Sequence, residues 1–158
     1  MGNQRLQRIQ ALTKYNRWLS DAIRWIEQQR AANHFRGSVL GPICVEVELT
    51  DVKFGCAVNK QIPFFLSNAF VFTDKTDQKQ AQDASRANRW PGFTTIFFDQ
   101  RSAESRPSLS RVSQVFPSAV FLDEVIKAPE EVMKTLRERA GIHRVVRMEF
   151  RLFLDAAL

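Results

Sequence analysis

The chain has 158 residues, of which 44% are hydrophobic and 25% charged, and its formal net charge is +6. This length fits one domain or two small lobes with a hydrophobic core, and no run approaches the ~20 apolar residues that a membrane helix needs. The positive charge is uneven: residues 1–30 carry six Lys and Arg against two acidic residues, and residues 73–112 carry seven against five. Such asymmetry points to polyanionic partners and says little about the fold.

Residues 4–33 are predicted to form one helix, because neither Gly nor Pro interrupts them. Apolar residues recur there at alternating spacings of three and four, which is a heptad seam with one polar position. The seam residues are Ile9, Leu12, Asn16, Leu19, Ile23 and Ile26. Two interpretations stay open: an amphipathic helix that packs on its own domain, or a coiled-coil arm that spans residues 1–34.

Three strands are predicted in the next forty or so residues. Apolar and polar residues alternate from Ile43 to Leu49, residues 52–58 continue as a second apolar run, and residues 69–73 form a third. Cys44 and Cys56 then lie on neighbouring strands, and two buried free thiols are favoured over a disulfide.

The second half of the chain mixes helix and strand. Residues 74–88 are polar and fit either a solvated helix or a loop, whereas residues 93–98 are typical of a strand. Residues 115–120 are expected to hold a short extended piece. A helix begins at Pro129 and closes at Gly141, and residues 146–153 alternate as a last strand. The expected fold class is α+β.

Signatures of catalysis are missing from the sequence. It has no Gly-rich phosphate loop, no nucleophile elbow and no Cys or His spacing for a metal. His34 and His143 are expected to be caps or surface groups. Asp123–Glu124 fits a solvated turn and Glu130–Glu131 a helix start, so an enzyme that uses an acidic pair is the weakest hypothesis. No cofactor, metal or small-molecule substrate is predicted.

Cationic residues with one aromatic residue occupy the central polar region. Cationic grooves with aromatic platforms bind single-stranded nucleic acid. The candidate nucleic-acid-binding residues are Arg86, Arg89, Trp90, Arg101, Arg106 and Arg111. An ordinary basic surface with Trp90 in the core is the alternative. A second possible basic strip on the N-terminal helix is explained equally well by solvation.

The order of several short motifs resembles a known family. The run FRGSVLGPI at residues 35–43 is followed by VEV, DVK, AV, IP and AFV segments up to residue 71. The later segments LDEVI and APEEVM, at residues 122–133, continue the pattern. Together they are similar to the hinge domain of SMC (structural maintenance of chromosomes) proteins, most of all to the fifth eukaryotic paralogue.

The resemblance implies a two-lobed hinge over residues 35–158, with a first lobe at about 35–88 and a second at about 89–158. It also implies pairing with another SMC hinge, typically the sixth paralogue, affinity for single-stranded DNA, a nuclear location, and a role in chromosome maintenance and DNA repair. The ATPase heads of the family are absent from this chain. Phe64, Phe65 and Leu66 are candidate interface residues, with burial in the core as the stronger alternative.

The sequence departs from the family after Val146, because no glycine-rich closing segment and no exit helix follow. A hinge fragment without its return arm, a shortened chain and a free-standing hinge-like protein all stay open. So does homo- against heterodimerisation. The alternative function is a stand-alone domain that binds single-stranded nucleic acid and does not serve as a hinge.

Overall fold

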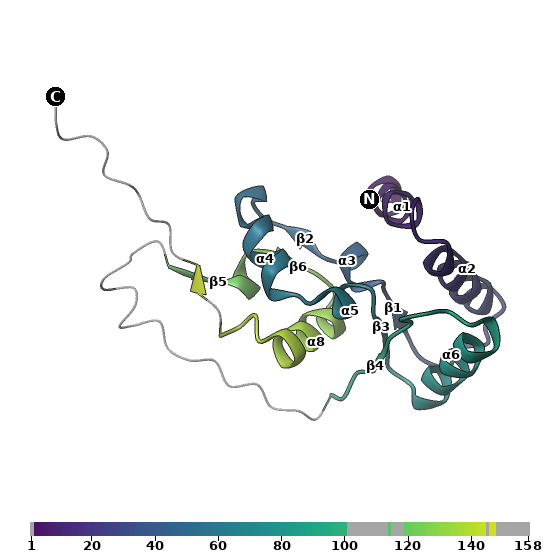
Figure 1. The fold of residues 1–158 in the computed structure, drawn as a ribbon. Coiled ribbons are helices and arrows are strands. Elements are labelled where there is room, and N and C mark those ends of the chain that lie inside the picture. Colours follow the sequence, from purple (N-terminus) through teal and green to yellow (C-terminus); the bar gives the residue numbers. More distant parts are fainter. Residues whose placement is uncertain (1, 101–113, 115–118, 145, 148–158) are drawn as a thin grey trace.

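The computed structural model describes residues 2–100, 114, 119–144 and 146–147, and its fold is mixed α/β (Figure 1). The helices are α1 (Gly2–Thr13), α2 (Arg17–Ala31), α3 (Ile43–Glu46), α4 (Gly55–Gln61), α5 (Phe64–Ser67), α6 (Lys75–Asn88) and α8 (Glu130–Ala140), with 3-10 turns at Val52–Phe54 and Leu122–Glu124. The strands are β1 (Val39–Leu40), β2 (Glu48–Leu49), β3 (Phe70–Phe72), β4 (Thr95–Phe97), β5 (Val120–Phe121), β6 (Ile126–Lys127) and β7 (Val146–Arg147).

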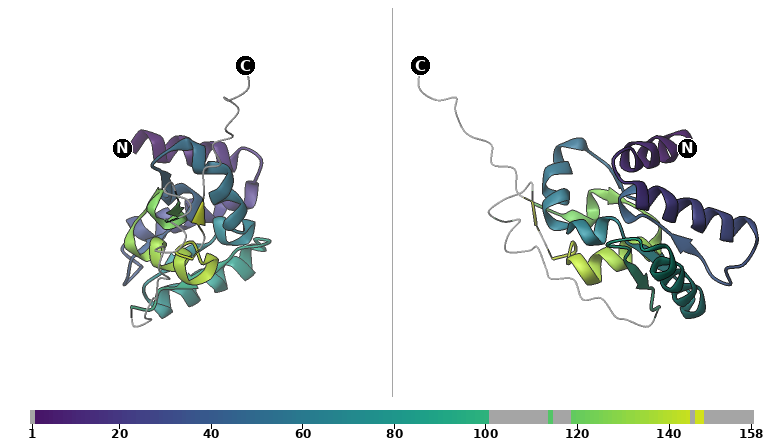
Figure 2. Two further views of the ribbon diagram at one scale, coloured as in Figure 1. Left: turned by 90° about the vertical axis from the view of Figure 1, so that its left-hand side faces the viewer. Right: turned by 45° about the vertical axis from the view of Figure 1, so that its right-hand side comes forward.

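The N-terminal region forms two helices, so the single helix predicted over residues 4–33 is wrong. Asn16 leaves the helical backbone with φ −134° and ψ 87°, and its side chain accepts a 3.4 Å hydrogen bond from the N–H of Leu19. The polar seam residue is therefore the N-cap of α2, a role that Asn fills well. In both views of Figure 2, α1 does not continue the axis of α2.

The apolar side of α2 packs on its own domain, which agrees with the first of the two interpretations of the seam. Leu19, Ile23 and Ile26 are buried, and Ile9 and Leu12 of α1 are partly buried at the edge of the same cluster. The other buried members of this cluster are Val39, Phe70, Phe72 and Ala81. The long coiled-coil helix of the predicted fold is not present in the described residues.

A three-stranded sheet in the order β1-β3-β4 separates two hydrophobic clusters. β3 pairs antiparallel with β1 and parallel with β4. Because side chains alternate along a strand, Phe70 and Phe72 point to the cluster under α2 and α6, while Val71 points to the other cluster. In Figure 1, α8 lies on one side of this sheet, and α2 and α6 lie on the other.

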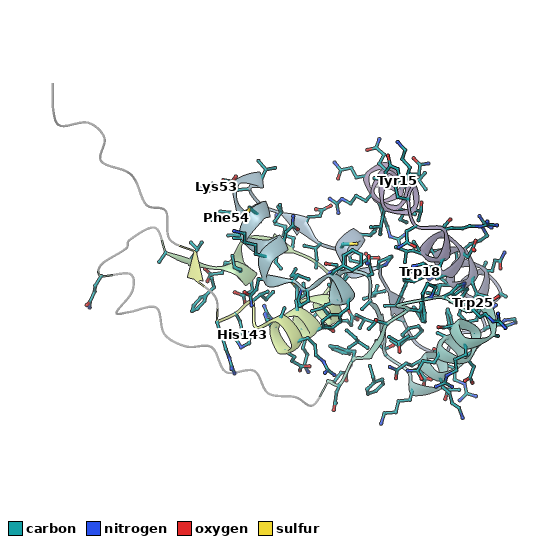
Figure 3. All side chains as sticks on the ribbon, in the orientation of Figure 1. Tyr15, Trp18, Trp25, Lys53, Phe54 and His143 are labelled. Atoms are coloured by element: carbon teal, nitrogen blue, oxygen red, sulfur yellow. The ribbon has the colours of Figure 1, made fainter. Side chains whose placement is uncertain are left out.

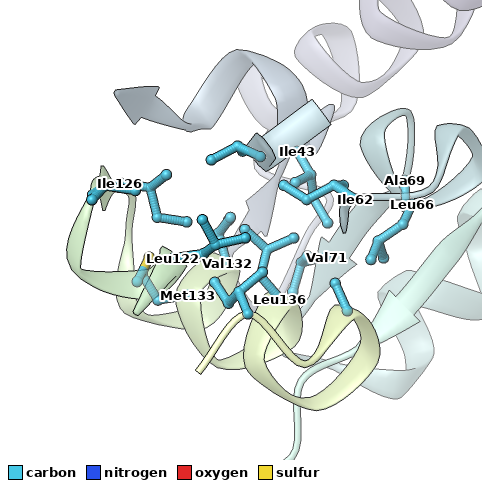
Figure 4. Close-up of a cluster of buried hydrophobic side chains, with 14 of the residues drawn as sticks. Ile43, Ile62, Leu66, Ala69, Val71, Leu122, Ile126, Val132, Met133 and Leu136 are labelled. Carbon is cyan, nitrogen blue, oxygen red and sulfur yellow. The ribbon is translucent and has the colours of Figure 1, made fainter. Parts of the chain in front are cut away.

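The larger cluster joins distant parts of the chain (Figure 4). It combines residues between 43 and 71 with residues between 122 and 142, and so draws on both predicted lobes. Its fully buried members include Ile43, Val132 and Leu136. The two further sheets, β2-β6 and β5-β7, are antiparallel pairs, and β2-β6 again joins the early part of the chain to the late part.

Two of the predicted strands are helical instead. Residues 43–46 form α3 after Pro42, and only Glu48–Leu49 of that run pairs as strand β2. Residues 52–61 form a 3-10 turn and α4, in which Phe54 and Val58 bury one helical face four residues apart. Cys44 and Cys56 are both free, but Cys56 is exposed, so its predicted burial is wrong.

The remaining element predictions agree with the structure where it describes them. β3 and β4 lie in the predicted strands at 69–73 and 93–98, and α8 starts after Pro129 and ends before Gly141, whose φ is 63°. Residues 74–88 are a helix. Of the strand predicted at 146–153, Val146 and Arg147 are strand β7 and the rest lies outside the described residues. Of the extended segment expected at residues 115–120, Val120 is the first residue of strand β5.

Two carboxylates fix the start of α6: one caps the helix, and the other attaches it to the loop between α2 and β1. Asp74 caps its N-terminus and accepts hydrogen bonds from the N–H groups of Thr76 and Asp77 at 2.7 and 3.1 Å. The buried side chain of Asp77 accepts from the N–H groups of Arg36 and Gly37, both at 2.8 Å. Polar residues outside these contacts leave α6 with a solvated outer face, which is why its sequence looks loop-like.

Across the described residues, every helix is too short or too polar to span a bilayer.

Candidate pairing surface

Large apolar side chains are exposed at three places between residues 49 and 65, here together called the apolar rim. Phe64 and Phe65 of α5 are 79% and 61% exposed, Val52 is 87% exposed, and Leu49 is at the limit of exposure. Such side chains cost free energy in water, and a group of them marks a contact surface on many proteins. The rim is the strongest candidate for an interface in the described residues.

The local sequence explains why α5 presents two phenylalanines to solvent. Pro63 ends the preceding segment and serves as the N-cap of a helix of only four residues. Within that single turn Leu66 points inward and is 1% exposed, while Phe64 and Phe65 point outward. Leu66 therefore belongs to the core, and its prediction as an interface residue is wrong. The accessibility of Phe64 and Phe65 suits that role, which stays a prediction.

A small apolar pocket of about 200 Å³ lies among α3, β2 and α4. Its lining includes Ile43, Val47, Leu49, Val58 and Ile62. Cys44 also lines it, and burial raises the pKa of this thiol to about 11. A raised pKa keeps the thiol protonated and unreactive at neutral pH, so the pocket is suited to an apolar side chain rather than to chemistry.

Groups that could support catalysis or bind a metal are dispersed. No cluster of three or more His, Cys, Asp or Glu side chains occurs among the described residues. His34 is exposed and contacts the Gln29 amide, but His143 is buried, so the prediction that His143 is a surface group or cap is wrong. Its Nε2 accepts a hydrogen bond from Arg144 at 3.2 Å.

The two carboxylate pairs have structural partners. Asp123 is buried and accepts a 3.1 Å hydrogen bond from Nε of Arg137 on α8, so it does not lie in a solvated turn. Glu124 accepts from the N–H of Phe121 at 3.3 Å. Glu130 and Glu131 lie in the first turn of α8, as predicted, where negative charge favours the helix.

The predicted nucleic-acid-binding residues are only partly brought together. Arg86 and Arg89 are exposed at the end of α6, where Arg86 pairs with Asp83 at 3.1 Å and Arg89 has a φ of 53°. Trp90 is 9% exposed, with its ring centroid 6.1 Å from Trp25 and 5.4 Å from Phe93. It is a core residue, and its prediction as a base-stacking platform is wrong. Arg101, Arg106 and Arg111 lie outside the described residues.

Comparison with known proteins begins with a negative result: no family model matches the sequence. Among solved structures, the Smc5/6 hinge domain of S. pombe superposes with a TM-score of 0.77 at 14% identity over 91% of this chain. The fold is that of an SMC hinge domain. This finding confirms the resemblance that the motif order predicts.

Two prokaryotic hinge domains share this fold at lower similarity. The SMC hinge of Pyrococcus furiosus matches 78% of this chain with a TM-score of 0.53 and 12% identity, and 66% of that hinge chain is covered. An asymmetric dimer of the Geobacillus stearothermophilus SMC hinge matches 91% with a TM-score of 0.51 and 13% identity, with 62% covered. The chain covers 54% of the S. pombe hinge chain, so it spans about half of that length.

Proposed function

We propose that this chain is a pairing module of the SMC-hinge type, which joins another hinge and performs no chemical reaction itself. The agreement in fold with the S. pombe Smc5/6 hinge over 91% of the chain carries this proposal. One of the other matching structures is a dimer of hinge domains. The partner in this proposal is a second hinge, either another copy or the sixth paralogue, and the site of action is the chromosome in the nucleus.

The apolar rim supplies a physical reason for pairing. Burying an exposed Phe side chain yields about 1.5–3 kcal/mol, and Phe64 and Phe65 are both largely exposed. Leu49 and Val52 add further exposed apolar area, and Leu49 also lines the apolar pocket. A partner hinge that covers the rim gains this energy.

Sedimentation equilibrium of the chain, alone and mixed with the hinge of the sixth paralogue, tests the proposal. We expect a dimer in one of the two samples. Replacing both Phe64 and Phe65 with Ser should weaken it at least about 100-fold, because two phenyl groups no longer become buried on pairing.

The matched control replaces Leu6 and Tyr15 with Ser in the same way. These two residues are also exposed, but they lie on α1 and in the turn that follows it. The mass of this variant should be unchanged. A monomer in both samples contradicts the proposed function, and equal weakening by both variants contradicts the assignment to the rim.

Binding of single-stranded DNA is the second candidate function. It is favoured by the net charge of +6 and by the exposure of Arg86 and Arg89 at one end of α6. Arg101, Arg106 and Arg111 remain part of this proposal through the sequence alone. Without Trp90 at the surface, the interaction would depend on phosphate contacts, which are strongly salt-dependent.

Titration of labelled single-stranded DNA at several salt concentrations tests this second function. Changing Arg86 and Arg89 to Gln should lower the slope of log affinity against log salt by about 0.7 for each phosphate group that is no longer neutralised. Arg139→Gln is the control, because Arg139 is exposed on α8, on the other side of the sheet. Equal slopes for the two variants would remove Arg86 and Arg89 from the binding surface.

A further inference from the structure

Helix α1 folds back along α2. Nη1 of Arg5, near the start of α1, lies 3.9 Å from the carboxylate of Glu27, near the end of α2. Tyr15, in the turn between the helices, is 86% exposed (labelled in Figure 3). The two helices therefore form a hairpin whose closed end is the turn at residues 14–16.

Two arginines on α1 attach this hairpin to α3 and β2. Nη2 of Arg5 lies 3.1 Å from Glu46, and Nη1 of Arg8 donates to the carbonyl oxygens of Val45 and Val47, both at 3.1 Å. Nη2 of Arg8 also lies 3.4 Å from Glu48. These side chains are partly exposed, so the ion pairs contribute little individually and weaken as salt rises.

Apolar packing beneath α1 is incomplete. A cavity of about 470 Å³ opens between α1 and the chain around β1, lined by Arg5, Arg30, Phe35, Val39 and Glu46 among others. Arg5 and Glu46, which form an ion pair, both lie on the wall of this cavity. Ile9 and Leu12 provide the apolar contact of α1, and they are only partly buried. The folded-back position is therefore held largely by polar contacts.

The sequence through the turn is compatible with a continuous helix. Residues 14–16 are Lys, Tyr and Asn, with neither Gly nor Pro. Leu12 and Leu19 are seven residues apart, so in a continuous helix the apolar positions of α1 and α2 would share one heptad seam, with Asn16 as its polar position. The side-chain cap from Asn16 to Leu19 is the local contact that favours the bend.

We propose that α1 alternates between the folded-back position and a straight continuation of α2, with Arg5 and Arg8 favouring the folded-back state. In the straight state, Ile9 and Leu12 leave the edge of the domain and line up with the seam of α2. Glu46, Glu48 and the carbonyl groups of Val45 and Val47 then lose their arginine partners. This conformational change does not depend on pairing with another hinge.

Distance measurements by pulsed electron spin resonance test this proposal. Spin labels are placed at Gln7→Cys and Gln28→Cys, two exposed positions on α1 and α2, in a chain with Cys44→Ala and Cys56→Ser. A straight helix separates the two backbone positions by about 32 Å. The labelled chain is diluted with excess unlabelled chain, so that distances between chains do not contribute.

We expect a short distance and a population near the straight-helix distance. The long population should rise several-fold from about 0.01 M to 1 M salt, as the screening length falls from about 30 Å to 3 Å. Arg5→Gln with Arg8→Gln should raise it at low salt and remove most of its salt dependence. Asn16→Ala should raise it about fivefold, because loss of a side-chain N-cap has an effect of that size. Arg24→Gln, which removes an exposed α2 cation paired with Asp21, should leave it unchanged.

Two results would overturn the proposal. One is a single short distance in all variants at every salt concentration, which means a rigid hairpin. The other is a broad distribution accompanied by loss of helical circular dichroism, which means that α1 unfolds rather than straightens.

Discussion

Replacing Asp77 with Ala should destabilise the domain by about 2–4 kcal/mol. Its side chain is 1% exposed and accepts hydrogen bonds from two backbone N–H groups, those of Arg36 and Gly37, at 2.8 Å each. Hydrogen bonds to a charged acceptor contribute about 1.5–3 kcal/mol each. Two such bonds sum to about 3–6 kcal/mol. Both contacts are only part-buried, so water replaces some of this stabilisation and the expected loss falls to about 2–4 kcal/mol.

Urea unfolding followed by circular dichroism measures this loss, and the slope m should stay constant if only stability changes. In a thermal scan the same loss corresponds to a fall in Tm of roughly 4–16 °C for a domain of this size. Asp77→Asn keeps an acceptor oxygen but not the charge, so its stability should fall between those of the parent and the Ala variant.

Asp83→Ala is the matched control on the same helix. Asp83 is exposed and pairs with Arg86 on the surface, and such pairs contribute about 0–1 kcal/mol. If Asp77→Ala and Asp83→Ala destabilise equally, the carboxylate of Asp77 does not hold the loop to α6, and the reasoning from its hydrogen bonds fails.

Three further outcomes follow from local geometry. Gly37→Ala should destabilise the domain by about 1–3 kcal/mol, because the new Cβ would lie 2.5 Å from the Thr73 hydroxyl oxygen. An unchanged midpoint of urea unfolding would show that the loop around Gly37 shifts without cost. In a thiol-labelling time course at pH 8, exposed Cys56 should react before Cys44. Burial raises the pKa of Cys44 from 9.0 to about 11, so the thiolate fraction of Cys44 falls about 100-fold. Similar labelling rates in the two single-cysteine variants would contradict this. Hydrogen bonds from backbone N–H groups in the first turn of α6 lower the pKa of Asp74 below its usual 3.8. The stability that this cap provides should therefore be complete above about pH 4 and be lost as the pH falls further. Parallel acid unfolding curves for the parent chain and an Asp74→Ala variant would argue against this pH dependence.

Elements with strong boundary signals were predictable from sequence. Pro129 and Gly141 mark the ends of α8, and acidic residues in its first turn and basic residues in its last add the expected charge pattern. The aromatic and β-branched runs that contain β3 and β4 have no helical periodicity, and both are strands. The hinge fold was accessible through the order of short motifs, although the superposed structures share only 12–14% of residues with the chain.

Short apolar segments were not predictable, for a physical reason. Between Ile43 and Val58 the apolar residues fit a period of two and a single helical turn equally well, and a run this short cannot separate the two. Tertiary packing decides between helix and strand here. Ile43 and Val45 are both buried in helix α3, and a strand would also have placed both of them on one buried face, so their burial alone does not distinguish the two. The bend at Asn16 was hidden for a similar reason, because Asn suits both a polar heptad position and an N-cap.

Aromatic residues at the candidate sites show the same limit. Trp90 follows a cationic helix end, and Phe64 and Phe65 follow a proline, but only the fold determines which side chain turns inward. Trp90 meets Trp25 from a helix more than sixty residues earlier in the chain, a contact that no local pattern encodes. The exposed phenylalanines of α5 depart from the usual burial of residues of this type, whereas the buried tryptophan follows it.

The three residues of β3 have a consequence for how the domain unfolds. Phe70 and Phe72 are shared with one hydrophobic cluster and Val71 with the other, and all three are essentially inaccessible to solvent. Loss of β3 would therefore disrupt both clusters, and a slip of the strand by one residue would place the phenyl rings and the isopropyl group on the wrong faces. Because β3 contributes to both clusters, their unfolding is coupled, and the domain should unfold in one cooperative transition rather than in two.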